Sequence, residues 1–102
     1  CMDVKEEGTR KKYVVINVEN IKDSQELHKL LKSELEFPHF YGMSWDAFWD
    51  AITGLVQLPE VTIIKGYKIL KKDLPQDAEI LVNTLERYNN LFSLFRTKLI
   101  LD

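Results

Sequence analysis

The sequence contains only one cysteine, Cys1, and we assign it no role. Without a second cysteine no disulfide can form within the chain, so the fold depends on packing alone, which suits a reducing compartment. Long apolar runs are also absent, since the longest, such as residues 13–18, fall far short of the ~20 residues of a membrane span. The charged segment from Met2 to Lys12 has no apolar export core. These absences predict a cytoplasmic protein with no membrane partner.

Clustered positive charge is missing as well. The 14 Lys and Arg residues are outnumbered by 16 Asp and Glu residues, which gives a net charge of −2. A protein that binds nucleic acid directly needs clustered cations, because they displace the counterions that surround the phosphates. We therefore expect no nucleic acid as a direct ligand.

Motifs for metals and cofactors are lacking too. His28 and His39 have no partner ligands at metal-binding spacing, and the four glycines do not form a phosphate-binding loop. No metal site and no cofactor are therefore predicted. We place His28 on the polar side of the first predicted helix and His39 in the loop that follows it.

The chain does contain the alternating elements of an α/β protein. Three runs of β-branched and aliphatic residues have the length of strands and lie at residues 13–18, 61–64 and 97–101. Helical spacing, with caps at Asp23 and Ser44, predicts helices at residues 24–35, 45–56 and 75–90, and a short helical turn within 67–74. This order implies a three-stranded parallel sheet packed by about four helices. The strand at 61–64 has no polar alternation, which predicts that both of its faces are covered.

The length of the chain sets the number of domains. A chain of 102 residues with 45% apolar residues has enough material for one core and too little for two. We expect one domain over residues 13–102, monomeric when free, after a charged and partly disordered segment over residues 1–12.

Between the first two predicted helices lies a loop. Pro38 ends the first helix, and Gly42 supplies a flexible turn.

One stretch of the chain contains acidic residues but no Lys or Arg. No Lys or Arg occurs between Lys32 and Lys65, whereas Asp and Glu occur there five times. Asp46 and Asp50 are four residues apart on a predicted helix, so their carboxylates lie on the same face, where they repel each other. This arrangement is mildly unfavourable for the free protein.

Aromatic residues border this acidic pair. Trp49 forms the rim of the apolar stripe, Thr53 lies on the same side, and residues 40–42 lead into that end of the helix. Acidic groups beside aromatic residues and a small-residue loop are typical of a binding hot spot for a positively charged partner. The pattern also fits a solvated helix face with tryptophans in the core, so the residues alone leave both interpretations open. Trp45 falls inside the apolar stripe, which favours packing in the core.

Residues 35–54 resemble the barstar family, whose founding member inhibits the ribonuclease barnase. The resemblance rests on the stretch LEFPHFYGMSWDAFWDAITG, and a weaker similarity extends over residues 11–102. It implies the α/β fold predicted above and a protein that catalyses nothing. It also implies that the loop and the second helix enter the active site of a nuclease, where acidic side chains take the places of RNA phosphates.

The resemblance also implies which residues bind the partner. They are Asp50, Asp46, Trp49, Phe40, Gly42, Ser44, Thr53 and Trp45. Asp50 would be the central contact and, with Asp46, would pair with the cationic catalytic groups of the enzyme. Phe40, Ser44 and Trp45 depart from the residue types of the family. An ungapped match further places Arg87 where the family has an acidic residue, with Glu86 one position earlier, so the cognate nuclease need not be barnase.

Three functions stay open at this point. The first is inhibition of a barnase-type ribonuclease by an acidic helix and loop that mimic RNA phosphates. The second is an immunity or regulatory module of the same fold that binds a different toxin or basic protein. The third is a small enzyme that uses Asp46 and Asp50 as acid and base. The first two predict a tight 1:1 complex with a basic protein, whereas the third predicts turnover.

Overall fold

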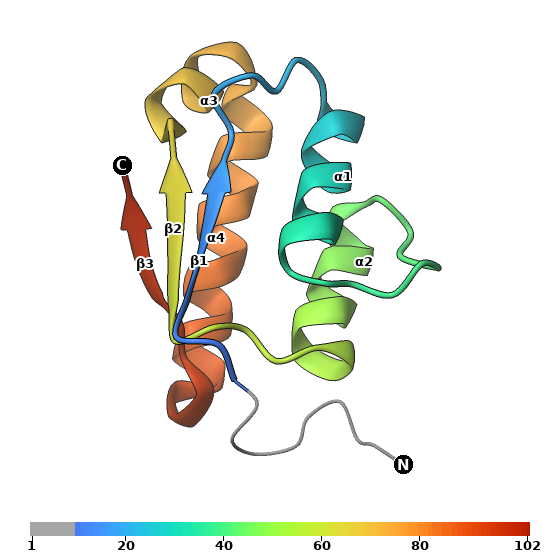
Figure 1. Cartoon of the computed structure of the whole chain (residues 1–102), viewed down its shortest axis with the longest axis vertical. Coiled ribbons are helices and arrows are strands. Elements are labelled where there is room, and N and C mark those ends of the chain that lie inside the picture. The colour runs from blue at the N-terminus through green and yellow to red at the C-terminus, as the bar shows by residue number, and fades with distance from the viewer. Residues whose placement is uncertain (1–9) are drawn as a thin grey trace.

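A three-stranded parallel sheet forms one layer of the structure, a computed structural model that describes residues 10–102. Its strands are β1 (Tyr13–Asn17), β2 (Val61–Lys65) and β3 (Lys98–Leu101), and their order in the sheet is β1-β2-β3 (Figure 1). The register places Val15 beside Ile63 and Ile63 beside Ile100. Each strand lies within one residue of its predicted bounds, and the predicted α/β fold is confirmed.

Four α-helices occur in the described part of the chain: α1 (Ser24–Glu34), α2 (Trp45–Asp50), α3 (Tyr67–Asp73) and α4 (Pro75–Leu91). A π-helical turn η1 (Ala51–Leu55) continues α2, and a 3-10 turn η2 (Ser93–Phe95) follows α4. Two helices begin at the predicted caps. The Asp23 carboxylate accepts a hydrogen bond from the Glu26 N–H at 2.8 Å, and the Ser44 hydroxyl oxygen accepts one from the Ala47 N–H at 3.1 Å.

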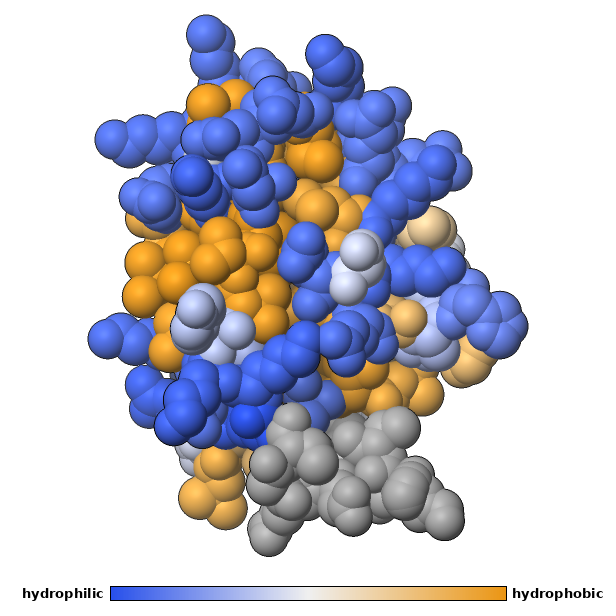
Figure 2. Space-filling view, viewed as in Figure 1, coloured by the Kyte–Doolittle hydropathy of each residue, from blue (hydrophilic) through white to orange (hydrophobic). Residues whose placement is uncertain are grey.

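The helices cover only one face of the sheet, so the prediction that both faces of β2 are covered is wrong. Burial alternates along β1, where Val14 and Ile16 are buried while Tyr13 and Val15 are exposed. Figure 2 shows an apolar patch over the strands on the open face. The cause is topological. The chain steps twice in the same direction across the sheet, and right-handed crossovers then place both connections on the same face.

The core lies between this covered face and the helices α1, α2 and α4. Its largest fully buried residues include Ile16, Leu27, Leu31, Phe48, Ile52, Ile64, Leu81 and Leu85. His28 also belongs to it, with 2% of its surface exposed, so the prediction that His28 lies on the polar side of its helix is wrong. The helical spacing places His28 next to Leu27, and the tertiary structure brings an aromatic loop over that side of α1.

The second helix does not run as a regular α-helix over residues 45–56. After Asp50 the chain widens into η1, where the Val56 N–H donates to the Ala51 carbonyl five residues back at 3.0 Å. The Thr53 hydroxyl donates to the Trp49 carbonyl at 2.7 Å, which gives this carbonyl a partner at the point where the hydrogen-bond pattern changes. The predicted apolar stripe nevertheless stays on the core, because Phe48 and Ile52 are fully buried and Leu55 and Val56 pack against the core.

The predicted segment at residues 1–12 lies largely outside the described residues, which begin at Arg10. The Arg10 side chain donates hydrogen bonds to the carbonyls of Leu58 at 2.8 Å and Phe95 at 2.9 Å. These bonds attach the chain before β1 to the segments before β2 and β3, all at the same end of the sheet.

Candidate functional site

A groove between α2 and α4 gathers four of the eight predicted site residues. It has a volume of about 410 Å³ and is lined by Trp45, Asp46, Trp49, Asp50, Ile80, Thr84 and Arg87. The four residues of α2 come from consecutive turns of one helix face. The three residues of α4 are spaced by four and three positions, so they also lie on one face. The groove is therefore built by two helices that pack side by side.

The carboxylates of Asp46 and Asp50 face solvent. Both residues are exposed, and neither forms an ion pair within 4.0 Å in the part of the chain that the structure describes, where Lys11 and Glu36 form one. Asp46 lies in the first turn of α2, where the helix dipole favours a negative charge, whereas Asp50 lies at the end of this short helix. Two uncompensated carboxylates on one face form an acidic surface that can bind cations from outside.

Trp49 lines the groove together with Asp46 and Asp50 of the same helix. Its ring is half-buried and packs against the core. The Arg87 guanidinium lies over this ring, with 4.3 Å between its Cζ atom and the ring centroid. A positive charge from α4 therefore lines the same groove as Asp46 and Asp50, without an ion pair to either.

Trp45 is both a core residue and a groove residue. Its ring lies 4.5 Å from the His28 ring and 5.3 Å from the Phe48 ring, measured between centroids. Its indole N–H donates to the Asp77 carboxylate on α4 at 3.0 Å. The other side of the ring lines the groove. Trp45 thus fixes α2 against α1 and α4 while part of it stays accessible to a partner.

A buried hydrogen-bond network holds the loop that precedes α2. Nδ1 of His28 and the Tyr41 hydroxyl lie 2.7 Å apart, and the Tyr41 hydroxyl donates to the Ser44 carbonyl at 3.3 Å. A neutral His28 with its proton on Nδ1 satisfies both bonds, because Nδ1–H then donates to the tyrosine oxygen. Burial lowers the pKa of His28, although Asp77 acts in the opposite direction. Burial also raises the pKa of Tyr41 above its ordinary value.

Two residues of this loop other than glycine adopt the left-handed backbone conformation. Glu36 has a φ of 59° and Met43 a φ of 55°, whereas Gly42 does not have a positive φ. The prediction that Gly42 supplies the turn is therefore wrong. Gly42 serves a close approach instead, because a Cβ atom there would lie 3.2 Å from the Cβ of Ala47. A side chain at this position would have to push the loop away from α2.

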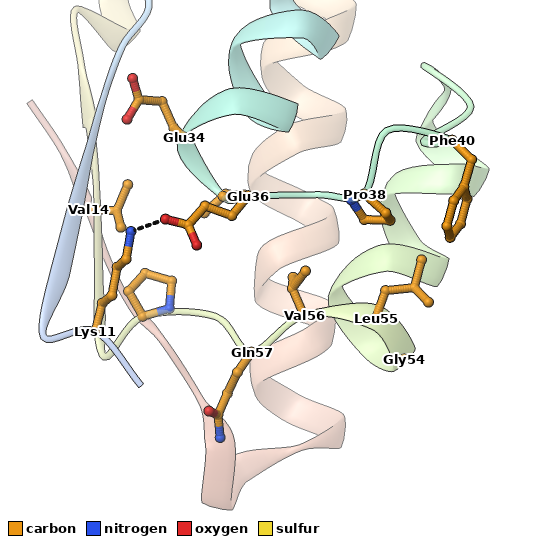
Figure 3. A pocket seen from close by; sticks show the side chains of 12 residues that line it. Lys11, Val14, Glu34, Glu36, Pro38, Phe40, Gly54, Leu55, Val56 and Gln57 are labelled. Carbon is orange, nitrogen blue, oxygen red and sulfur yellow. Dashed lines mark hydrogen bonds and ion pairs between the residues drawn. The ribbon is translucent and has the colours of Figure 1, made fainter. Parts of the chain in front are cut away.

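Phe40 extends from the loop, with 65% of its surface exposed, and lies beside a second hollow. This hollow has a volume of about 680 Å³ and is bounded mainly by the loop, the end of η1 and the chain before β1. In Figure 3, Phe40 and Leu55 lie at one end of it and the ion pair of Lys11 with Glu36 at the other. An exposed aromatic ring beside a hollow can pack against a partner at little entropic cost.

The part of the chain that the structure describes offers no group of three or more His, Cys, Asp and Glu residues that could hold a metal ion. Among residues 10–102, no helix is both long enough and apolar enough to cross a membrane.

Comparisons with known proteins show the family of the chain. The profile of the family described as Barstar (barnase inhibitor) matches residues 11–99, which is most of the chain. The chain belongs to the barstar family. It is also 30% identical over 73 residues to a protein of Bacillus subtilis (strain 168) with the name "Putative ribonuclease inhibitor YrdF". The match covers 72% of this chain and 80% of that protein.

In this barstar family member, the residues predicted to bind a partner take three positions. Trp45, Asp46, Trp49 and Asp50 line the groove between α2 and α4. Phe40 lies beside the larger hollow. The other three have local structural contacts, since Ser44 caps α2, Thr53 bonds within its own helix and Gly42 lies against Ala47.

Nothing in the sequence predicts that α4 forms one side of the groove in this barstar family member. Helical spacing with Leu81 and Leu85 predicts that Ile80 and Thr84 belong to the apolar face of this helix, yet Ile80 is 37% exposed and both residues line the groove. Arg87 was noted only as a departure in charge. The spacing of Ile80, Thr84 and Arg87 on one helix face was the available signal, but nothing in the sequence says that this face meets α2.

Proposed function

We propose that this protein inhibits a barnase-type ribonuclease by inserting the groove face of α2 and the loop before it into the active site of the enzyme. Membership of the barstar family and the similarity to a protein named as a ribonuclease inhibitor support a ribonuclease-inhibitor role. In this proposal the protein catalyses nothing, is monomeric when free and works in the cytoplasm.

The observation that carries the mechanism is the pair of exposed, unpaired carboxylates beside half-buried tryptophans. An enzyme that cleaves RNA must bind phosphates, so its active site is lined with cations. Asp46 and Asp50 offer such an enzyme two anions, fixed one helical turn apart on a helix held by Trp45 and Ser44. Little conformational freedom is lost when a rigid surface of this kind binds.

Replacement of the two aspartates one at a time tests the proposal. Asp50→Ala should weaken binding to the inhibited ribonuclease more than Asp46→Ala, because the resemblance to the family makes Asp50 the central contact, next to Trp49 in the groove. Loss of one partner of a buried charge pair costs about 2–5 kcal/mol, or roughly 30- to 5,000-fold in Kd. Titrations of ribonuclease activity measure this effect, with barnase as the first enzyme.

The matched control is Glu79→Ala, which removes an exposed carboxylate of α4 outside the groove. This variant should inhibit like the wild type. Urea unfolding of the free protein should show that Asp50→Ala is as stable as the wild type or slightly more stable, since repulsion between like charges at this spacing is worth only about 0.2–0.5 kcal/mol. Wild-type inhibition by Asp50→Ala would exclude this surface as the inhibitory one.

The second candidate function is an immunity or regulatory module of the same fold, directed at a different basic protein. Arg87 is the observation that favours it, because this cation distinguishes the groove from a purely acidic surface. A complex with a basic protein that is not a ribonuclease, lost in Asp50→Ala, would favour this alternative.

A further inference from the structure

The groove between α2 and α4 carries charges of both signs. Asp46 and Asp50 contribute two negative charges from α2, and Arg87 contributes the only positive charge among the residues that line the groove. The segment that contains α2 adds no other Lys or Arg, because neither occurs in residues 33–64. A partner that docks on the acidic pair therefore also meets the Arg87 guanidinium.

Arg87 is held in place by an aromatic contact and not by an acid. Its Cζ atom lies 4.3 Å from the centroid of the Trp49 ring, and it forms no ion pair within 4.0 Å in the described part of the chain. A guanidinium that stacks on a ring keeps its N–H groups free in its own plane, where they suit a carboxylate in bidentate geometry. Arg87 is thus an exposed donor, without an acidic partner in the described part of the chain, that a partner's carboxylate can reach.

The position of this donor makes it selective. An active site that is basic throughout would bind Asp46 and Asp50 well but would place a cation against Arg87, and like charges across an interface discriminate strongly against a partner. A partner with a carboxylate beside its phosphate-binding cations would satisfy all three groups. The contact with Trp49 favours the position of the guanidinium over the groove.

We propose that Arg87 is a specificity-determining residue that selects a ribonuclease carrying a carboxylate next to its cationic active site and rejects ribonucleases that are basic there. This inference rests on the proposed function, since it assumes that the groove faces the active site of a ribonuclease. It adds a second chemical requirement on the partner, which the acidic pair alone does not impose.

The test compares charge reversals against barnase, the ribonuclease named in the description of the family. Arg87→Glu should lower the Kd for barnase at least 10-fold at low salt, and Arg87→Gln should lower it by a smaller factor. Arg96→Glu is the matched control, because Arg96 is exposed outside the groove and the change in net charge is identical. Its Kd should change less than threefold.

Equal changes in Arg87→Glu and Arg96→Glu would overturn the inference, because they would show an effect of net charge alone. Weaker binding by Arg87→Glu, or no binding by either the wild type or this variant, would also overturn it. Urea unfolding of each variant distinguishes a loss of binding from a loss of structure.

Asp50→Ala, made both in the wild type and in Arg87→Glu, separates this inference from the proposed function. If Asp50→Ala abolishes binding while Arg87→Glu has no effect, the inhibitory surface is supported and the role of Arg87 is wrong. If Asp50→Ala leaves the binding of Arg87→Glu unchanged, the proposed function itself fails.

Discussion

At the scale of single residues, His28 connects the core to the loop that precedes α2. It is 2% exposed and contacts three different segments, through the Tyr41 hydroxyl, the Trp45 ring and the charge of Asp77 on α4. Its neutral form satisfies the hydrogen bond to Tyr41, whereas a second ring proton would have to be accommodated in a buried site. The ionisation of one side chain is therefore coupled to the position of the loop.

This coupling predicts that the protein loses stability as the pH falls below about 6.5. Burial lowers the pKa of His28 below its ordinary value of 6.5, so the unfolded chain binds a proton at a higher pH than the folded one. The stabilisation is complete above pH 6.5 and decreases as the pH falls from there towards the lowered pKa. Urea unfolding at pH 8, 6.5 and 5.5 measures the effect.

His28→Gln should lose most of this pH dependence, although its stability at pH 8 can also be lower. His39→Gln is the matched control, because His39 is exposed. In the described part of the chain, the only aromatic ring that its ring contacts is that of Phe40. This control should retain the wild-type pH dependence. The same dependence in His28→Gln and in the wild type would assign the effect to other groups.

At the scale of elements, the junctions between helices and strands decide where the side chains of the site lie. Gly66 ends β2 and begins α3 with a φ of 83°, and a Cβ atom there would lie 2.3 Å from the Cγ of Glu19 and 3.2 Å from its backbone nitrogen. The loop after β1 therefore passes close to this junction. Only glycine fits both requirements.

Gly66→Ala should destabilise the fold by about 1–2 kcal/mol, because a side chain in the left-handed region costs this much before the contact with Glu19 is counted. Gly54→Ala is the matched control, since a Cβ atom there would meet no atom within 4 Å. The control should be as stable as the wild type. Urea or thermal unfolding compares the two variants, and equal stabilities would contradict the strain at Gly66.

At the scale of the whole molecule, charge and apolar surface are divided between two sides. The groove and the loop carry the acidic surface, whereas the open face of the sheet carries an apolar patch that includes Val15, Ile63 and Ile100 (Figure 2). The net charge of −2 is small, so attraction of a basic partner depends on how the acidic residues are placed. Residues 34–60 contain five acidic residues and no Lys or Arg, so their charge is not offset within this segment.

Association with a basic ribonuclease should therefore depend steeply on salt. We expect the on-rate to rise about 10- to 1,000-fold between high and low ionic strength, with a much smaller change in the off-rate. Stopped-flow mixing with barnase measures both rates. Asp46→Asn and Asp50→Asn should flatten the salt dependence, while Glu79→Gln, outside the groove, should preserve it. An on-rate of the wild type that is independent of salt would contradict electrostatic steering towards this surface.

Much of the fold follows from local signals in the sequence. Strand positions came from runs such as residues 13–18, and helix starts came from Asp23 and Ser44, because a cap is a contact between residues three apart. The acidic pair was also predictable, since the spacing of Asp46 and Asp50 places them on one helix face without any tertiary contact. The family resemblance then supplied their proposed role.

The sequence by itself determined the elements, their parallel order and the acidic face of α2, because each depends on short-range geometry or on the order of elements along the chain. Only the tertiary structure decided that His28 is buried, that one face of the sheet stays open and that Arg87 lies over Trp49. These features depend on which helix faces meet, and residues such as Trp49 and Arg87 are 38 positions apart in the chain. The short-range spacing of residues in the sequence does not indicate a contact of that kind.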